Sequence, residues 1–416
     1  MGGLGMSLPT NIPLPNFDAL QETFVTRPDD VLNGKGFNTG TEKSLAGYTQ
    51  QGLFNEDLNH EDDGNAIYAM VTFSGELGNT PYSGNIGLRY IDNSNSTIGE
   101  MSEPLDIDFS DPSAPEVIVG PAEFVSVAHD YTEMLPSLNL RFDPTDDIVV
   151  RASVAKVMSR PNYLDLNPRF TVQARNLTGR AGNGELDPTT AVQFDLAVEW
   201  YFAGYSIVSV GLFTKDIDAL VQPDLDLVPF SSGVLDPETN LPVVLATARP
   251  FNSGNSELTG IELSFQRTFE DLLPAPFDGL GVIANYTFID SGSDFLNEKT
   301  GASYGIPGLS ENTLDLTVFY EKDQWRARLS YNFRDEFLDG VLGGFSGHPR
   351  FVESYEQWDA SFGYSLNENM SFAFEAINLA DENVYYYNLL ATGTQQYRSQ
   401  AINTGRRYQF GFRWKM

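Results

Sequence analysis

The ten residues WRARLSYNFR, at positions 325–334, alternate strictly between apolar and polar side chains. The apolar positions are Trp325, Ala327, Leu329, Tyr331 and Phe333. Successive side chains of a β-strand point to opposite faces, so this segment predicts a strand with one apolar and one polar surface.

The same alternation recurs along most of the chain. It is clear at 192–202 and 407–415, where apolar residues again occupy every second position. Further strands are expected at 64–77, 84–93, 121–142, 147–158, 206–221, 257–269, 279–290, 309–321, 356–366 and 369–379. The pattern therefore predicts an all-β protein of about 13 strands, each long by the standards of soluble proteins.

The connections between these strands alternate in length. The short ones cover 143–146, 203–204, 321–323 and 367–369. The long ones cover 94–120, 159–191, 222–256, 291–308, 336–355 and 380–404. In an up-and-down antiparallel sheet, the short turns then lie at one end and the long loops at the other, which is typical of an outer-membrane β-barrel.

The composition agrees with a membrane barrel. Aromatic residues make up 12% of the chain, and many fall near strand ends, where interfacial girdles lie. The mean hydropathy is only −0.25, and no apolar run is long enough for a transmembrane helix. A soluble β-sandwich or propeller is the alternative, because its strands also alternate between apolar and polar residues.

The charge and the cysteine content limit the kinds of partner and metal that the chain is expected to bind. The net charge of −32 and the lack of a Lys and Arg patch argue against a nucleic-acid partner, and the acids are expected to be solvated. Without cysteine there is no disulfide and no thiolate metal site. Residues 1–63 read as a loop-rich segment, such as an extracellular loop, and start without a signal-peptide pattern. Either the protein stays inside the cell or its precursor is longer.

Several stretches resemble one family. They include YTEMLPSLNLRFDPTDDIVVRASVAKVMSRP (131–161), GELDPTTAVQFDLAVEWYF (184–202), FDGLGVIANYTFIDS (277–291), FEAINLADE (374–382) and TGRRYQFGFRWKM (404–416). In their order they resemble TonB-dependent outer-membrane receptors, especially the group common in Caulobacter- and Xanthomonas-like bacteria. The resemblance spans about residues 64–416.

The resemblance implies a transmembrane barrel of 22 strands with a plugged lumen. Residues 64–416 correspond to its C-terminal portion, about 13 strands, with the plug absent. It also implies the outer membrane of a Gram-negative bacterium, contact with its lipid, and a TonB complex reached through the missing N-terminal part. The implied function is TonB-energised nutrient uptake, with an oligosaccharide favoured over a ferric siderophore as cargo. The alternatives are a passive porin- or adhesin-like barrel and a soluble acidic glycan-binding β-protein.

Aromatic residues in the expected loops are candidate cargo contacts, because their faces stack on sugars or catecholates while Arg supplies directional bonds. The candidates are Tyr385, Tyr386, Tyr387, Tyr397, Arg398, Tyr163 and Phe345. Membrane anchoring in the outer girdle is the alternative role. On the polar faces of late strands, a second set is expected to face the lumen and pair with acids there: Arg326, Arg328, Arg334, Arg407 and Arg413.

Catalytic and metal motifs are weak, so neither an enzyme nor a cofactor is expected. GFSGH (344–348) ends in His where a nucleophile elbow needs Gly. Asp57, Asn59, Glu61 and Asp63 alternate as calcium ligands could, but the Gly and the twelfth-position Glu of an EF-hand are not in place. A solvated loop is the simpler interpretation of this acidic run.

Overall fold

The computed structural model describes residues 59–110, 116–173, 178–229, 233–236, 240–293, 296–297, 302–343, 348–390 and 396–415. The chain divides into two compact units, Met1–Asn59 and His60–Met416. The described residues belong to the second unit, apart from Asn59 at its border. Among the described residues, no helix has the length and apolarity needed to span a bilayer.

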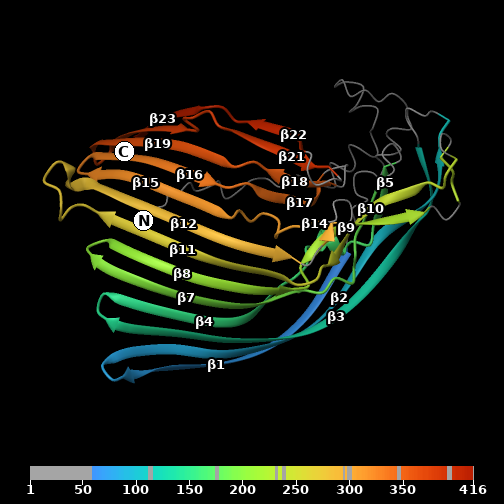
Figure 1. The fold of residues 1–416 in the computed structure, drawn as a ribbon, viewed down its shortest axis with the longest axis horizontal. Coiled ribbons are helices and arrows are strands. Elements are labelled where there is room, and N and C mark those ends of the chain that lie inside the picture. The colour runs from blue at the N-terminus through green and yellow to red at the C-terminus, as the bar shows by residue number, and fades with distance from the viewer. Residues whose placement is uncertain are drawn as a thin grey trace. The chain divides into compact units, whose positions relative to one another are not determined.

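One sheet of 13 strands dominates the described part of the chain, and its strands lie side by side in chain order (Figure 1). They are β1 (Asn59–Leu77), β2 (Thr80–Asp108), β3 (Glu116–Thr145), β4 (Ile148–Ser159), β7 (Thr189–Ala203), β8 (Ser206–Asp218), β11 (Ser256–Thr268), β12 (Leu280–Ser293), β15 (Asn312–Lys322), β16 (Trp325–Arg334), β19 (Tyr355–Asn367), β20 (Met370–Ile377) and β23 (Arg407–Trp414). The predicted all-β class and strand number are confirmed. We call the end with the short connections the turn end and the opposite end the loop end.

The register of the sheet aligns polar side chains with polar side chains across neighbouring strands. Directly paired residues are hydrogen-bonded through their side chains in several places. The pairs are Asn139 with Asn85 at 3.0 Å, Ser153 with Asp195 at 2.9 Å, Ser264 with Asn285 at 2.7 Å and Thr317 with Ser330 at 2.9 Å. A one-residue slip would turn every one of these groups to the apolar side, so the alternation fixes the register.

The other face of the sheet is apolar and exposed. Val210, Leu263 and Trp200 are 40%, 42% and 50% exposed, and Phe410 on β23 is 71% exposed. Such a surface suits lipid better than water, because a soluble protein rarely exposes a continuous apolar patch of this size. At the turn end aromatic rings cluster on it, as in the pair Trp325 and Tyr364 with centroids 4.5 Å apart, which is the position of an interfacial girdle.

The connection predicted as a loop over 94–120 is wrong. β2 continues to Asp108 and β3 starts at Glu116, so the two strands form a long hairpin at the loop end. Alternation persists there: Asn93, Asn95 and Thr97 are buried on one face. These side chains are polar, and the opposite face is no longer apolar, so the sequence carries no amphipathic strand signal even though the backbone ladder continues.

Two smaller sheets occupy the loop end, inside connections that were expected to be loops. One combines β5 (Phe170–Gln173), β6 (Thr178–Ala181), β10 (Val244–Asn252) and β9 (Val221–Pro229). The other combines β17 (Phe337–Gly343), β18 (His348–Val352), β21 (Asn383–Leu389) and β22 (Gln396–Asn403). A two-stranded pair β13 (Leu296–Asn297) and β14 (Ala302–Ser303), one turn of helix α5 (Tyr163–Leu166) and a 3-10 turn η3 (Phe277–Gly279) complete the described elements. Leu245 of β10 packs with Ile107 of the long hairpin, which ties the first small sheet to β2.

Candidate aromatic and arginine site at the loop end

The strongest candidate site lies on the β17–β18–β21–β22 sheet. Its strand β21 carries the run Tyr385, Tyr386 and Tyr387, because aromatic and β-branched residues favour extended backbone. Strand β22 pairs with it and brings Arg398 opposite Tyr387. Because β22 also carries Tyr397, four predicted contact tyrosines and the predicted arginine lie in one sheet.

Arg398 is the centre of this site. Its guanidinium carbon lies 3.8 Å from the centroid of the Tyr385 ring. Its Nη2 donates to both carboxylate oxygens of Glu353, at 2.8 and 3.0 Å. The arginine side chain is 53% exposed, so its outer surface is open to a ligand. Stacking on Tyr385 and pairing with a carboxylate hold the guanidinium plane in place. A guanidinium held in this way can donate two parallel hydrogen bonds to carbonyl, hydroxyl or anionic groups.

A second arginine is held in the same way on this sheet. Arg350 of β18 lies with its guanidinium carbon 5.2 Å from the Tyr386 ring and donates through Nε to Asp339 at 2.6 Å. Glu353, Arg350 and Asp339 were not among the residues predicted from the sequence. Glu353 precedes Arg398 by 45 residues, so no local pattern connects the two.

Tyr387 is buried, with only 5% of its surface exposed. Its ring stacks on Phe351 with centroids 5.3 Å apart and planes 10° apart. Burial, and then the neighbouring Glu336 carboxylate, raise the pKa of the Tyr387 hydroxyl. In this structure Tyr387 supports the sheet, while Tyr385 and Tyr386 carry the arginine contacts.

The remaining predicted contacts are distributed differently. Tyr397 lies on β22 and is 39% exposed. Tyr163 begins α5 and belongs to another cluster, with its ring centroid 4.7 Å from that of His60. Phe345 lies outside the described residues.

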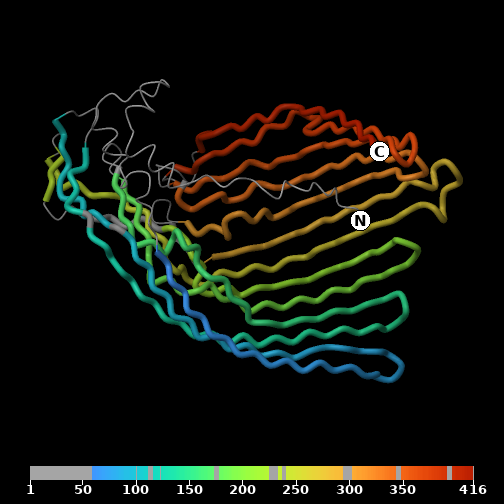
Figure 2. Tube along the Cα trace, turned by 180° about the vertical axis from the view of Figure 1, so that it is seen from behind, coloured from blue at the N-terminus to red at the C-terminus, as the bar shows by residue number. Residues whose placement is uncertain are grey.

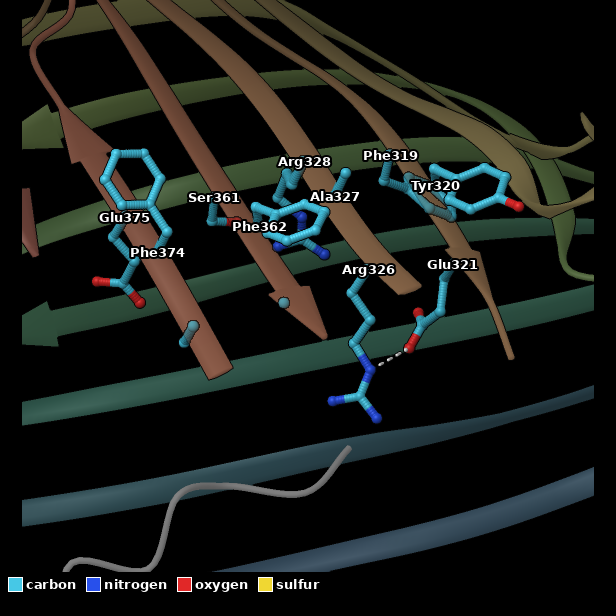
Figure 3. A pocket seen from close by; sticks show the side chains of 12 residues that line it. Phe319, Tyr320, Glu321, Arg326, Ala327, Arg328, Ser361, Phe362, Phe374 and Glu375 are labelled. Atoms are coloured by element: carbon cyan, nitrogen blue, oxygen red, sulfur yellow. Dashed lines mark ion pairs between the residues drawn. The ribbon is translucent and has the colours of Figure 1, made fainter. Parts of the chain in front are cut away.

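The arginines predicted to face the lumen share the polar face of β16 and β23. Figure 3 shows Arg326 and Glu321 directed toward one another across the β15–β16 turn, with Nε and Oε1 3.4 Å apart. Arg328, Ser361 and Glu375 line the same hollow of about 280 Å³. Arg334 is held instead at the end of β16, where its Nε donates to Ser310 at 2.7 Å.

Arg407 and Arg413 lie on β23 opposite Ile377 and Ser371 of β20. Arg326 pairs with an acid of the neighbouring strand, Glu321, whereas Arg334 contacts the Ser310 hydroxyl. Pairing of the whole set with acids of the lumen or of a plug stays a prediction.

The acidic run does not assemble into a metal site in the part of the chain that the structure describes. Asn59, Glu61 and Asp63 are exposed positions of β1, and Asp57 lies outside the described residues. Asp62, which the sequence analysis did not select, points to the other side and pairs with Arg160 at 2.5 Å. Among the described residues, no three His, Asp or Glu side chains come together as metal ligands.

Fold and alternation together define a membrane-spanning antiparallel β-barrel sheet with a polar inner face. The chain belongs to the TonB-dependent receptor-like β-barrel family, whose model matches residues 14–379. The resemblance found in the sequence is thereby confirmed at the level of the family. The Caulobacter and Xanthomonas group stays a prediction. A search of curated protein sequences found no match to the chain.

Solved receptors share the fold. The chain is similar to the ferric-catecholate import receptor Fiu from K12 E. coli, with TM-score 0.54, 18% identity, and coverage of 86% of this chain and 45% of that one. It is also similar to a variant of the ferric enterobactin receptor from Pseudomonas aeruginosa in complex with enterobactin. There the TM-score is 0.52 and the identity 16%, and the match covers 85% of this chain and 54% of that one. A third similar structure is the ferric yersiniabactin uptake receptor from Yersinia pestis, with TM-score 0.52, 16% identity, and coverage of 86% of this chain and 46% of that one. This chain spans about half the length of these receptors.

Proposed function

We propose that the chain is the barrel portion of an outer-membrane receptor that takes up a nutrient with energy from the TonB complex. The family membership and the alternation of exposed apolar and paired polar faces support this proposal. In it, the apolar face contacts the lipid of a Gram-negative outer membrane, and the polar face lines the lumen. TonB acts through the plug and N-terminal segment that the family resemblance implies. Neither catalysis nor a resident cofactor is part of this function.

The loop end faces the outside in this proposal, because long loops of such barrels are extracellular. The observation that carries the cargo site is the exposed Arg398 guanidinium, fixed between Tyr385 and Glu353. A rigid, oriented donor loses little conformational entropy when a ligand binds, so it supports affinity and selectivity together. Tyr386 with Arg350 and the exposed Tyr397 extend the same surface.

Two cargo classes fit this surface. An iron chelate is the first, because the solved receptors named above import iron chelates and because an arginine plane can pair with anionic oxygens. The preference for an oligosaccharide finds no support in those receptors. An oligosaccharide remains the second candidate on one observation, the net charge of −32, which repels anions and leaves neutral sugars unaffected.

The test is uptake by cells that carry the chain within its receptor, with and without a working TonB complex. Labelled ferric catecholates and labelled oligosaccharides are supplied in parallel. Uptake of one class that stops without TonB is the expected result, and the class that enters identifies the cargo. Entry that continues without TonB would instead make the protein a passive, porin-like barrel.

A further inference from the structure

The β2–β3 hairpin leaves one long strand edge without a neighbour among the described residues. β3 pairs with β2 along nearly its whole length, but with β4 only from Ser137 to Thr145. From Glu116 to Pro136 no described strand pairs with its second edge, and the hairpin can be followed beyond the end of β4 in Figure 2. The end of β4 contacts this stretch through a side chain, where Lys156 pairs with Glu133 at 2.7 Å. At about 3.3 Å per residue this free edge is roughly 70 Å long. Half of its N–H and C=O groups point away from β2, where another strand could pair with them.

The inner face of this hairpin is already occupied. Val117 packs on the cluster of Ile107 and Leu245, and His129 pairs with Asp187 at 2.9 Å. Among the described residues, no strand pairs with this edge. On β3, Ile118 and Phe124 are 47% and 75% exposed, and Val119, which follows Ile118 and points to the opposite face, is 52% exposed.

The charged side chains in the outer part of the hairpin, residues 90–140, have a single sign. Residues 90–140 contain ten acidic side chains and no Lys or Arg. Three of the acids lie on the free stretch of β3 and are exposed, at Glu116, Glu123 and Asp130. A second copy of the chain would bring the same acids together at this edge, and like charges opposite one another destabilise a strand pair.

We propose that the free edge of β3, residues 116–136, binds an extended cationic polypeptide segment by strand addition. Main-chain hydrogen bonds to the free edge provide the part of the affinity that does not depend on which residues of the segment lie opposite β3. Basic side chains of the segment lie beside Glu116, Glu123 and Asp130, and its apolar side chains cover Ile118 and Phe124. This surface is separate from the Arg398 site and binds a polypeptide partner at the loop end, independent of which nutrient the receptor imports.

The test uses the full chain in detergent and a labelled ten-residue peptide of alternating lysine and valine. A control peptide has proline in place of every second valine, so it keeps its charge but cannot complete a strand ladder. Fluorescence anisotropy gives the affinity, and amide hydrogen exchange locates the bound segment. We expect the first peptide to bind at least about tenfold tighter than the control and to slow exchange within 116–136.

Charge variants locate the surface independently. The double variant Glu116→Lys with Glu123→Lys should weaken binding at least about tenfold. The matched control, Asp146→Lys with Glu368→Lys, makes the same charge change in exposed turns at the turn end and should leave binding unchanged. Equal binding of the two peptides, exchange protection outside 116–136, self-association through this edge, or a larger effect of the control variant would each overturn the proposal.

Discussion

Arg398 and Tyr385 form a stacked pair, with the guanidinium carbon 3.8 Å from the ring centroid. Glu353 neutralises the arginine from a different connection of the chain, through hydrogen bonds of 2.8 and 3.0 Å. The guanidinium is therefore held flat and half exposed at the loop end, where the proposed receptor meets its cargo. The proposed cargo site depends on this geometry as well as on its charge.

Removing this arginine should weaken cargo binding. Arg398→Ala is expected to lower the affinity by roughly 1–3 kcal/mol, or about five- to 150-fold, because a charge-assisted donor and its stacked partner are lost. Arg398→Lys should recover only part of the loss, since lysine cannot present two parallel donors. Titration of the cargo identified by uptake measures both variants. Arg141→Ala removes an exposed arginine at the turn end and serves as the control, and an equal loss there would contradict the site.

Alkaline pH should loosen the sheet that carries the site. Burial and Glu336 raise the pKa of Tyr387 above its usual value of 10.0, so the folded sheet favours the neutral phenol. That contribution to stability is complete below the unfolded pKa and is lost as the pH rises through the folded one. We expect the protection of β21 amides, measured relative to β16 amides at the same pH, to fall above about pH 10, and Tyr387→Phe to reduce this loss. An unchanged profile in Tyr387→Phe would show that another group is responsible.

An added positive charge should cost very different amounts of stability at two neighbouring positions of β11. Leu263 is exposed on the apolar face, and Glu262 lies on the polar face beside it. Leu263→Arg is expected to destabilise the membrane-inserted state by about 2–4 kcal/mol if it lies near the bilayer midplane. Glu262→Arg should cost much less. Urea unfolding in lipid vesicles compares the two, and equal effects would argue against lipid on the Leu263 side.

A glycine at one cross-strand position accommodates an aromatic ring. Gly281 on β12 is paired directly with Phe319 on β15, and a Cβ on Gly281 would overlap Cζ of that ring. Gly281→Ala should destabilise the sheet by about 1–3 kcal/mol, because the ring must leave its place. Gly411→Ala is the matched control, since a Cβ there would meet Ala373 at an ordinary 3.7 Å. The midpoints of urea unfolding separate the two variants.

Sequence periodicity predicted the strands best where both faces have a strong character. The bounds of β16 coincide with the predicted 325–334, because five apolar residues alternate there with five polar ones. The extended parts of β2 and β3 were missed because their buried residues are polar, as at Asn93, Asn95 and Thr97. In that hairpin, backbone pairing and contacts with loop residues stabilise strands that have no amphipathic pattern.

The candidate site was predictable only in part. Tyrosine content and the nearby arginine drew attention to the connection that carries the candidate site, but three adjacent tyrosines look equivalent in a sequence. Their environments differ only in the folded sheet. Tyr387 is buried against the Phe351 ring of β18, whereas Tyr385 stacks with Arg398. The acidic partners, Glu353 and Asp339, come from other segments and depend on the tertiary structure.

The most direct test of the membrane-barrel account is a cysteine scan of β16. The chain has no cysteine, so single substitutions from Trp325 to Arg334 can each carry one fluorescent label in outer-membrane vesicles. Lipid-soluble and water-soluble quenchers are then compared at each position. The account predicts a period of two, with positions 325, 327, 329, 331 and 333 quenched from lipid and the positions between them from water. Equal quenching by water along the whole strand, or no membrane association of the protein, would contradict it.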